Sequence, residues 1–233
     1  MSPSPELEVV MAAHNEEGAV GDVVRACRRV LGPEVEIVVV DDGSSDRTAE
    51  EAREAGARVT SLPRNGGKGA AMRVGIGQSR AKWLIFLDAD GQDDPAEIPL
   101  LLEHRAPAVG LINGSRFLGE LREGSIPPAN RVGNVALTRL FAHLFGQEIT
   151  DSQAGFRVLR GDLIRGMQLL GSEYEFETEV MARVIGSGSQ VIEVPVTRER
   201  RAAGQTDFRR VRNGLRILFT MTALRLSLRG EGR

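Results

Sequence analysis

Leu84-Ile85-Phe86-Leu87-Asp88-Ala89-Asp90, together with Val38-Val39-Val40-Asp41-Asp42-Gly43-Ser44, decides the fold of this chain. In both stretches, an apolar run typical of a buried β-strand ends in a pair of carboxylates. Ligands of an open α/β sheet bind in the crevice at the carboxyl ends of its strands. Carboxylates two residues apart at such a place suit a hard divalent cation such as Mg²⁺ or Mn²⁺. The two stretches therefore predict an α/β sheet with a cation site that holds the phosphates of a substrate.

Alternating apolar and helical patterns extend this sheet through the first half of the chain. A mostly parallel sheet flanked by helices produces such an alternation. Asp94-Pro95-Ala96-Glu97 supplies an N-cap, a proline at the first helical position and a Glu that can close a capping box. The predicted strands are 7–13, 35–40, 58–62, 83–87 and 108–113, and the predicted helices are 17–31, 46–55, 68–80 and 95–105.

The pattern changes after Ser115, where residues 120–130 are rich in glycine, proline and charge. We interpret them as a mobile loop of about a dozen residues, a length that is often functional. The last strand carries Pro195 near its end, so it is expected at an edge of the sheet. The elements predicted in this half are helices 131–145, 161–169 and 175–185 and strands 155–160 and 190–197.

Composition limits the classes of partner. The chain has 233 residues, 27% of them charged, and a formal net charge of −2. A dedicated nucleic-acid binder would usually be strongly basic, so no nucleic-acid partner is expected. The single cysteine, Cys27, lies among valines at helical spacing and is interpreted as a buried structural thiol.

We predict one domain over residues 1–207 and a basic, apolar helix over residues 208–233. Its apolar stretch 215–228 carries two arginines and is shorter than the roughly 20 residues that span a bilayer. The helix could dock on the domain or lie at a membrane surface, where arginines meet anionic headgroups. These two interpretations can coexist. At the other end, the residues show no secretion signal.

Several motifs allow either a binding role or an ordinary structural one. Asn65-Gly66-Gly67-Lys68-Gly69 could hold a phosphate at a helix start or form a flexible turn. Arginines usually lie in solvent, but three separate sites beside predicted element ends favour phosphate recognition by guanidinium. These arginines are Arg116, Arg131 and the group Arg198, Arg200 and Arg201.

An ordered set of motifs resembles one family, the inverting family 2 glycosyltransferases of GT-A fold, and within it the polyprenyl-phosphate (dolichyl-phosphate) mannose or glucose synthases. The resemblance covers the chain from Ala12 to about Thr206. It implies a Rossmann-like, mixed and mostly parallel sheet flanked by helices. The motifs are 13–16 (AHNE), 41–48 (DDGSSDRT), 67–71 (GKGAA), 88–95 (DADGQDDP), 114–117 (GSRF) and 151–157 (DSQAGFR).

The resemblance implies transfer of mannose or glucose from GDP-mannose or UDP-glucose to a polyprenyl phosphate, with inversion and with Mg²⁺ or Mn²⁺. The nucleotide sugar would contact Ala12, His14, Glu16, Val40, Asp41, Asp42, Lys68, Asp88, Ala89 and Asp90. The metal would be bound by Asp88, Asp90 and Gln92, and the acceptor phosphate by Arg116, Arg131 and Arg201. Asp90, Arg116, Arg131 and Asp151 would be catalytic.

The protonation state of the acceptor supports the lipid-phosphate branch. A hydroxyl acceptor needs a carboxylate base, whereas a phosphate monoester is already anionic near neutral pH. Positioning and charge neutralisation would then carry the catalysis. Asp151 keeps a base-assisted transfer to a soluble hydroxyl acceptor open as an alternative.

Two departures from the family pattern keep other interpretations open. Ala12 and His14 replace a proline and a tyrosine that are common in the first motif, and Asp207 replaces a lysine that faces phosphate. A non-catalytic nucleotide-sugar-binding subunit is therefore a third hypothesis. The resemblance implies a cytoplasmic enzyme held peripherally at the inner face of the membrane. The sequence does not decide between a monomer, a homodimer and a complex with a membrane subunit.

Overall fold

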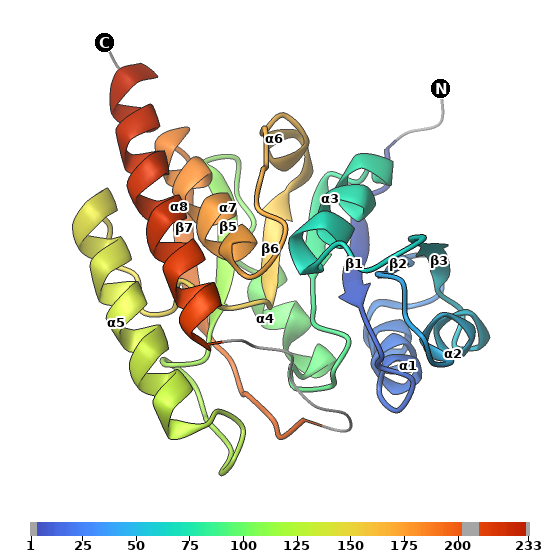
Figure 1. Cartoon of the computed structure of the whole chain (residues 1–233). Helices are drawn as coiled ribbons and strands as arrows, with labels where there is room; N and C mark the ends of the chain where they lie inside the picture. Colours follow the sequence, from blue (N-terminus) through green and yellow to red (C-terminus); the bar gives the residue numbers. More distant parts are fainter. Residues whose placement is uncertain (1–3, 202–209, 232–233) are drawn as a thin grey trace.

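The computed structural model describes residues 4–201 and 210–231 and contains one seven-stranded sheet with helices on both faces (Figure 1). The strand order is β3-β2-β1-β4-β6-β5-β7. The strands are β1 (Leu7–Ala13), β2 (Glu36–Asp41), β3 (Arg58–Ser61), β4 (Trp83–Phe86), β5 (Val109–Ser115), β6 (Arg157–Arg160) and β7 (Gln190–Pro195).

Eight α-helices and one short 3₁₀ helix are found in the described residues. The C-terminal helix α8 packs beside α5 and against α7 (Figure 1). The helices are α1 (Val20–Leu31), α2 (Thr48–Glu54), α3 (Lys68–Gln78), the 3₁₀ helix η1 (Pro95–Glu97), α4 (Ile98–Leu102), α5 (Pro128–Phe145), α6 (Gly161–Arg165), α7 (Glu175–Gly186) and α8 (Arg210–Glu231).

The sheet is mixed because β6 is inserted between β4 and β5. It runs antiparallel to both neighbours, whereas β3, β2, β1 and β4 pair in parallel and β5 pairs with β7 in parallel. Short crossovers through α1 and α3 bring the carboxyl ends of β1, β2 and β4 to one edge of the sheet. The acidic residues that follow β2 and β4 therefore meet at that edge.

Successive side chains of the central strands point to opposite faces of the sheet and belong to two apolar layers, one on each face. In β1, Val9 and Met11 belong to the layer under α1, while Val10 joins the layer under α3 and α7. Helix α3 approaches the sheet closely at Gly75, where an added Cβ would collide with the side chain of Val10. Both faces of β1 are therefore buried, as its almost continuously apolar sequence predicts.

Several predictions about individual elements are confirmed and three need correction. Cys27 is fully buried in α1, and burial raises the pKa of its thiol to about 12. Asp94 caps the turn at 95–97 by accepting from the N–H of Ala96 at 2.9 Å. The capping box is wrong, because the Glu97 carboxylate instead accepts from the N–H and hydroxyl of Thr197. The helices predicted over 95–105 and 161–169 are also shorter, since α4 ends at Leu102 and α6 ends at Arg165.

Helix α8 docks on the domain, as one of the two interpretations of residues 208–233 predicts. Ile217, Met221 and Leu224 are buried in the layer that α7 and α5 share. No helix among the described residues has the length and apolar character to cross a membrane. The departures from the family pattern at 202–207 lie outside the described residues, and the division at 207 stays a prediction.

Candidate functional site

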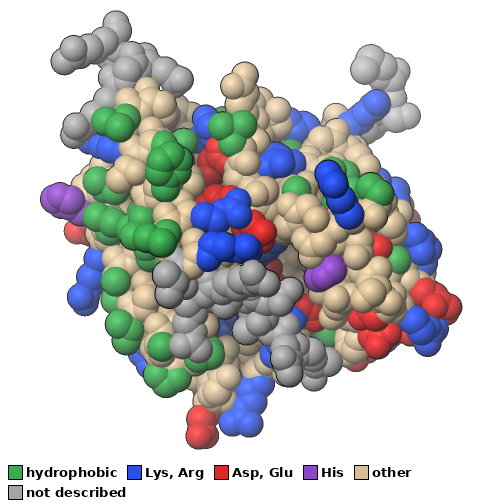
Figure 2. Space-filling model, viewed as in Figure 1, with side chains coloured by type: hydrophobic (Ala, Val, Ile, Leu, Met, Phe, Trp, Pro, Cys, Tyr) green, Lys and Arg blue, Asp and Glu red, His purple; other side chains and the backbone are tan. Residues whose placement is uncertain are grey.

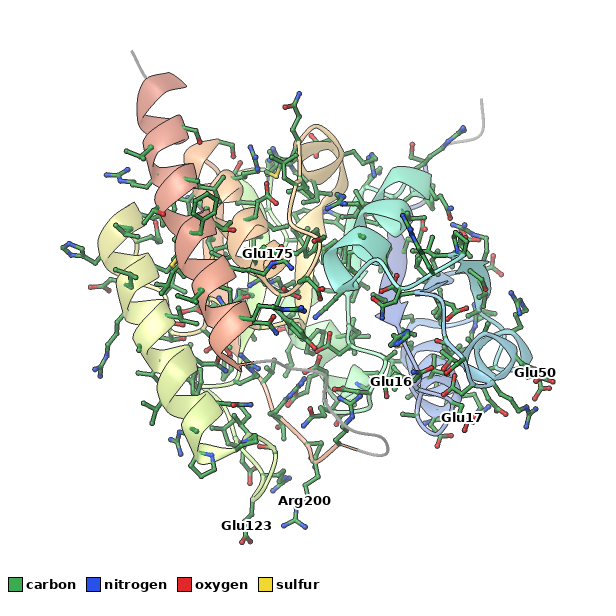
Figure 3. The ribbon with its side chains drawn as sticks, viewed as in Figure 1. Glu16, Glu17, Glu50, Glu123, Glu175 and Arg200 are labelled. Carbon is green, nitrogen blue, oxygen red and sulfur yellow. The ribbon has the colours of Figure 1, made fainter. Side chains whose placement is uncertain are left out.

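A pocket of about 680 Å³ opens at the carboxyl ends of β1, β2 and β4. Its far wall comes from the second half of the chain, from the residues before α7, after β7 and in α8. In Figure 3, Glu16 follows β1 and Glu175 begins α7, one in each of these two halves. The lining consists of Ala12, Ala13, His14, Asn15, Glu16, Asp42, Asn65, Gly67, Lys68, Asp88, Ala89, Asp90, Gln92, Glu173, Tyr174, Arg198, Arg201, Arg212 and Asn213.

Lys68 lines the pocket and is held between two carboxylates. Its Nζ lies 2.6 Å from Oδ1 of Asp88 and 2.7 Å from Oε1 of Glu177. Burial alone would raise the pKa of Asp88, but the charges of Lys68 and Arg198 outweigh it and lower that pKa. Asp88 is therefore ionised at neutral pH.

Arginines from the segment after β7 neutralise the second carboxylate of the pair. Arg201 lies 2.9 Å from Oδ2 of Asp90 and also pairs with Glu16. Arg198 binds Asp93 at 2.6 Å and approaches Asp90 at 3.8 Å. Burial and the charge of Asp88 raise the pKa of Asp90. The chain thus places two guanidinium groups beside the second carboxylate of the predicted metal motif.

The pocket still carries more carboxylates than cations. Five carboxylates gather around Lys68, Arg198 and Arg201, and an oxygen of three of them is buried with no hydrogen-bond partner: Glu16 Oε2, Asp93 Oδ2 and Glu177 Oε2. Unpaired buried oxygens of this kind are costly unless a cation or water satisfies them. Within the described residues no three acidic, His or Cys side chains already form a metal cluster. The donor set fits a divalent cation held by Asp88 and Asp90 with a phosphate-bearing ligand completing its shell.

Gln92 lines the pocket, but its side chain joins separate segments of the chain. Its amide oxygen accepts from Arg198 at 3.0 Å, and its amide nitrogen donates to the carbonyls of Ser125 and Glu199. In this arrangement Gln92 orients Arg198. A metal-binding role for Gln92 stays a prediction.

The glycine-rich loop before α3 is bound by a carboxylate of its own chain. Both oxygens of Asp42 accept backbone hydrogen bonds at 2.8 Å, one from Gly66 and one from Gly67. In this structure these two N–H groups are therefore bound to Asp42, and the choice between a phosphate-binding loop and a structural turn stays a prediction. His14 Nδ1 donates to the carbonyl of Asp42 at 3.0 Å, so the same residue also fixes the first loop.

Arg116 and Asp151 form a buried ion pair away from the pocket lining. Asp151 is fully buried, and its oxygens accept from Arg116 Nε at 2.7 Å and from Arg116 NH2 at 2.8 Å. This bidentate pairing occupies the groups that were expected to bind the acceptor phosphate or remove a proton. Arg116 acts on the site through its charge, which helps lower the pKa of Asp88.

The predicted site residues divide into two sets. The structure brings Ala12, His14, Glu16, Asp42, Lys68, Asp88, Ala89, Asp90, Gln92 and Arg201 into the lining of one pocket. Val40 is buried inside the sheet, Asp41 is buried beneath the loop at Ser44, and Arg131 is exposed on α5. Together with Arg116 and Asp151, these three lie outside the lining.

Residues just before α7 and in α8 complete the lining of the pocket, and Glu177 of α7 binds the lining residue Lys68; none of these was predicted as a site residue. Tyr174, the only tyrosine, precedes α7, and burial raises the pKa of its phenol. Glu177 follows one turn later and binds Lys68, while Arg212 and Asn213 come from the first turn of α8. Arg198 was noticed in the sequence only as one member of an arginine group. The others lie in ordinary helical patterns that carry no local signal of a site.

Comparison with known proteins agrees with this geometry. The model of the family described as glycosyl transferase family 2 matches residues 8–166. A dolichyl-phosphate hexose transferase from Haloferax volcanii is 30% identical over 201 residues, which cover 86% of each chain. The low-salt glycan biosynthesis hexosyltransferase Agl6 of the same organism is 33% identical, and the match covers 83% of this chain and 48% of Agl6. This chain therefore spans about half the length of Agl6.

A bacterial relative and a solved structure extend the comparison. An undecaprenyl-phosphate 4-deoxy-4-formamido-L-arabinose transferase from Pseudomonas aeruginosa is 34% identical over 254 residues, covering 100% of this chain and 71% of the relative. Glucosyl-3-phosphoglycerate synthase from Mycobacterium tuberculosis, solved with Mn²⁺, UDP and glucosyl-3-phosphoglycerate, matches with a TM-score of 0.76 at 22% identity. That match covers 94% of this chain and 80% of the synthase, and it confirms the predicted GT-A fold.

Proposed function

Because this chain belongs to glycosyl transferase family 2, we propose that it transfers a hexose from a nucleotide diphosphate sugar to a polyprenyl phosphate, with inversion at the anomeric carbon. The observation that carries the proposal is the pocket around Asp88 and Asp90, in which an excess of carboxylates faces arginine and lysine side chains. Such a site can hold a cation and the diphosphate that the cation neutralises. GDP-mannose and UDP-glucose are the donors we propose to test first.

The names of the relatives support the acceptor. Dolichyl phosphate and undecaprenyl phosphate appear in the names of two relatives that are at least 30% identical and match most of this chain. Both names describe transfer to a lipid carrier that ends in a phosphate. A phosphate monoester is anionic near neutral pH and can attack without a general base. The burial of Asp151 against Arg116 is compatible with that chemistry.

We assign the divalent cation, Mg²⁺ or Mn²⁺, to Asp88 and Asp90. Bound there, it would supply Lewis-acid stabilisation of the charge that develops on the leaving diphosphate. Lys68 lies within reach of the same negative charge, because its Nζ already pairs with Asp88. Arg201 would exchange its contact with Glu16 for a phosphate, which a guanidinium group binds in a fork. Ala12, His14 and Asp42 would flank the nucleotide.

We further propose that the outer face of α8 contacts the membrane, at its cytoplasmic side. Leu215, Phe219 and Leu226 lie on that face and are 62%, 75% and 72% exposed. Figure 2 shows hydrophobic side chains gathered over α5 and α8 on the face of the molecule that it displays. Arg212, in the first turn of the same helix, lines the pocket. A lipid whose tail lies along α8 could therefore present its phosphate to the pocket.

Release of GDP or UDP from a panel of sugar nucleotides, with and without a short-chain polyprenyl phosphate, tests the proposal. We expect lipid-dependent release from one donor with Mg²⁺ or Mn²⁺. Asp88→Asn should reduce kcat/KM at least about a hundredfold, the scale of one lost transition-state contact of about 3 kcal/mol. Asp22→Asn, on the exposed surface of α1, is the matched control and should leave kcat/KM unchanged.

Other results would redirect the assignment. Release that is indifferent to the lipid would support transfer to a soluble acceptor. No release from any donor, with nucleotide binding that survives Asp88→Asn, would support a binding subunit. For the membrane contact, Phe219→Ser with Leu226→Ser should reduce pelleting with anionic liposomes. The same variant should retain turnover of a detergent-dispersed short-chain lipid, and equal pelleting would refute the contact.

A further inference from the structure

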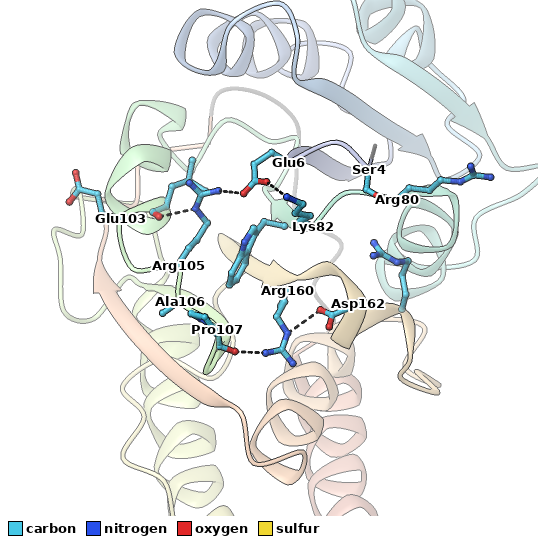
Figure 4. Close-up of a pocket in the computed structure, with 13 residues that line it drawn as sticks. Ser4, Glu6, Arg80, Lys82, Glu103, Arg105, Ala106, Pro107, Arg160 and Asp162 are labelled. Atoms are coloured by element: carbon cyan, nitrogen blue, oxygen red, sulfur yellow. Dashed lines mark hydrogen bonds and ion pairs between the residues drawn. The ribbon is translucent and has the colours of Figure 1, made fainter. Parts of the chain in front are cut away.

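A second cavity, of about 720 Å³, opens at the opposite end of the sheet from the pocket around Asp88 and Asp90, which we call the donor pocket. Figure 4 shows the second cavity. None of the residues that line this rear cavity lines the donor pocket. It lies where β1 and β4 begin and β6 ends, beside the segment after α4. Its polar wall includes Glu6, Lys82, Arg105, Arg160 and Arg165, and Trp83 also lines it. The volume falls within the range of about 300–1,000 Å³ that is usual for small-molecule sites.

The rear cavity has a surplus of positive charge. Five basic and three acidic side chains line it. Glu6 is shared between Lys82 at 3.0 Å and Arg105 at 3.2 Å. Arg160 pairs with Asp162 at 3.0 Å, as Figure 4 shows. The two remaining cations, Arg80 and Arg165, form no salt bridge within the described part of the chain, although the charge of Arg165 acts on the buried Glu8.

Backbone carbonyl oxygens hold three of the four arginine side chains of the rear cavity in place. Arg105 Nε donates to Leu102 O at 3.0 Å, Arg160 NH1 to Pro107 O at 2.7 Å and Arg165 NH1 to Ala81 O at 2.9 Å. A carbonyl oxygen orients a guanidinium group without neutralising its charge and leaves other N–H donors for a ligand. Ligand binding therefore costs less side-chain entropy, because these arginines are already ordered.

Trp83 adds a fixed aromatic wall. It is the only tryptophan of the chain and the first residue of β4. Its backbone N–H donates to the carbonyl of Glu6 at 3.0 Å. The residue is 9% exposed, so only a small part of the indole can face the cavity. Aromatic faces pack against flat rings and against the apolar faces of sugars. The cavity thus combines anchored guanidinium groups with a ring-binding surface.

We propose that the rear cavity binds a small organic phosphate whose ring packs on Trp83 and whose phosphate is held by the arginines. Guanidinium groups recognise phosphate through paired N–H donors, which a surplus of fixed arginines can supply here. The ligand is a ring-bearing phosphate of the size of a sugar phosphate or a nucleoside monophosphate. This site is separate from the donor pocket, so its occupancy does not depend on the proposed transferase reaction.

Intrinsic fluorescence tests the proposal directly because Trp83 is the single tryptophan. Ribose 5-phosphate and AMP are titrated into the full chain, with ribose and inorganic phosphate as the two halves of the ligand. We expect a saturable change in emission with the ring-bearing phosphates and a weaker response to either half. Isothermal titration calorimetry with AMP provides a second readout. We expect the binding of AMP to the rear cavity to persist in Lys68→Gln, which alters the donor pocket only.

The double variant Arg80→Gln with Arg165→Gln removes two cations from the rim. Both side chains are exposed, so the fold should be retained, which thermal unfolding checks. We expect at least a tenfold loss of affinity for AMP in this variant. Arg29→Gln, an exposed arginine of α1 remote from the cavity lining, should bind as the unmodified chain does. Absence of saturable binding in both assays, equal binding by the double variant, or loss of binding in Lys68→Gln would overturn the proposal.

Discussion

Replacing Asp151 with alanine removes the partner of a buried guanidinium group, and its effect separates a structural role from a catalytic one. The Asp151 carboxylate accepts four hydrogen bonds: two from the Arg116 side chain, one from the Arg116 N–H and one from the Gln153 N–H. The Asp151 side chain is 0% exposed and that of Arg116 is 10% exposed. Water therefore cannot replace the lost carboxylate without entering the core beside β5.

The expected loss of stability follows from that burial. Removing one member of a buried, hydrogen-bonded ion pair costs about 3–5 kcal/mol, because the remaining charge is left unpaired. A change of 1 kcal/mol shifts Tm by about 2–4 °C for a domain of this size. Asp151→Ala should therefore lower Tm by roughly 6–20 °C. Asp22→Ala breaks the exposed pair with Arg25 and should cost less than about 1 kcal/mol.

Thermal unfolding and urea denaturation of the two variants measure this difference. The double variant Asp151→Ala with Arg116→Met is the further control, because it removes the stranded charge and should recover part of the lost stability. Activity of the folded fraction is measured at a temperature well below the lowest Tm. An Asp151→Ala protein with unchanged Tm and abolished turnover would refute the structural role and restore Asp151 as a general base.

Three further predictions concern pH, packing and the cation. Burial raises the pKa of Glu16 to about 7 from 4.5, so its contribution to stability is complete below about pH 4.5 and is lost as pH rises through 7. The Tm of the unmodified protein minus the Tm of Glu16→Gln should therefore decrease as the pH is raised from 5 to 8. A difference that stays constant over this range would contradict the raised pKa of Glu16. Gly75→Ala should destabilise the protein by about 1–3 kcal/mol because the new methyl group meets Val10. Gly77→Ala places its methyl group where nothing lies within 4 Å and should stabilise the protein by about 0.5–1 kcal/mol. Urea denaturation measures the free energy of unfolding of both variants. Chelation with EDTA should abolish nucleotide release, and Mg²⁺ or Mn²⁺ should restore it; release that persists after chelation would remove the cation from the proposed chemistry.

Local sequence patterns were sufficient for the elements that build the crevice. The apolar run 83–87 predicted β4, and the carboxylates that follow it predicted an acidic crevice at the end of that strand. Both signals lie within a few neighbouring residues. The insertion of β6 between β4 and β5 has no comparable local signal. Strand pairing of this kind depends on residues far apart in the chain, and here only the family resemblance predicted a mixed sheet.

The site residues that lie outside the pocket lining or bind partners of their own chain share one physical cause, which is competition for partners within the chain. Arg116 and Arg131 look alike in sequence, yet one is buried against a carboxylate 35 residues away and the other is exposed. The glycine-rich loop allowed either a phosphate-binding role or a structural turn, and in the structure Asp42 accepts from two of its N–H groups. Glu177 belongs to an ordinary helical pattern and reaches Lys68 only because α7 packs where it does. Tertiary contacts decide these assignments.

The ion pairs that neutralise the acidic cluster also set an order of events during protein synthesis. Arg201 follows its partner Asp90 by 111 residues, and Arg198 follows Asp93 by 105 residues. At a translation rate of about 5–20 residues per second, the carboxylates leave the ribosome roughly 5–20 seconds before these arginines. During that interval the emerging half of the chain carries uncompensated negative charge. Free divalent cations can thus reach the nascent carboxylates before the arginines compete for them.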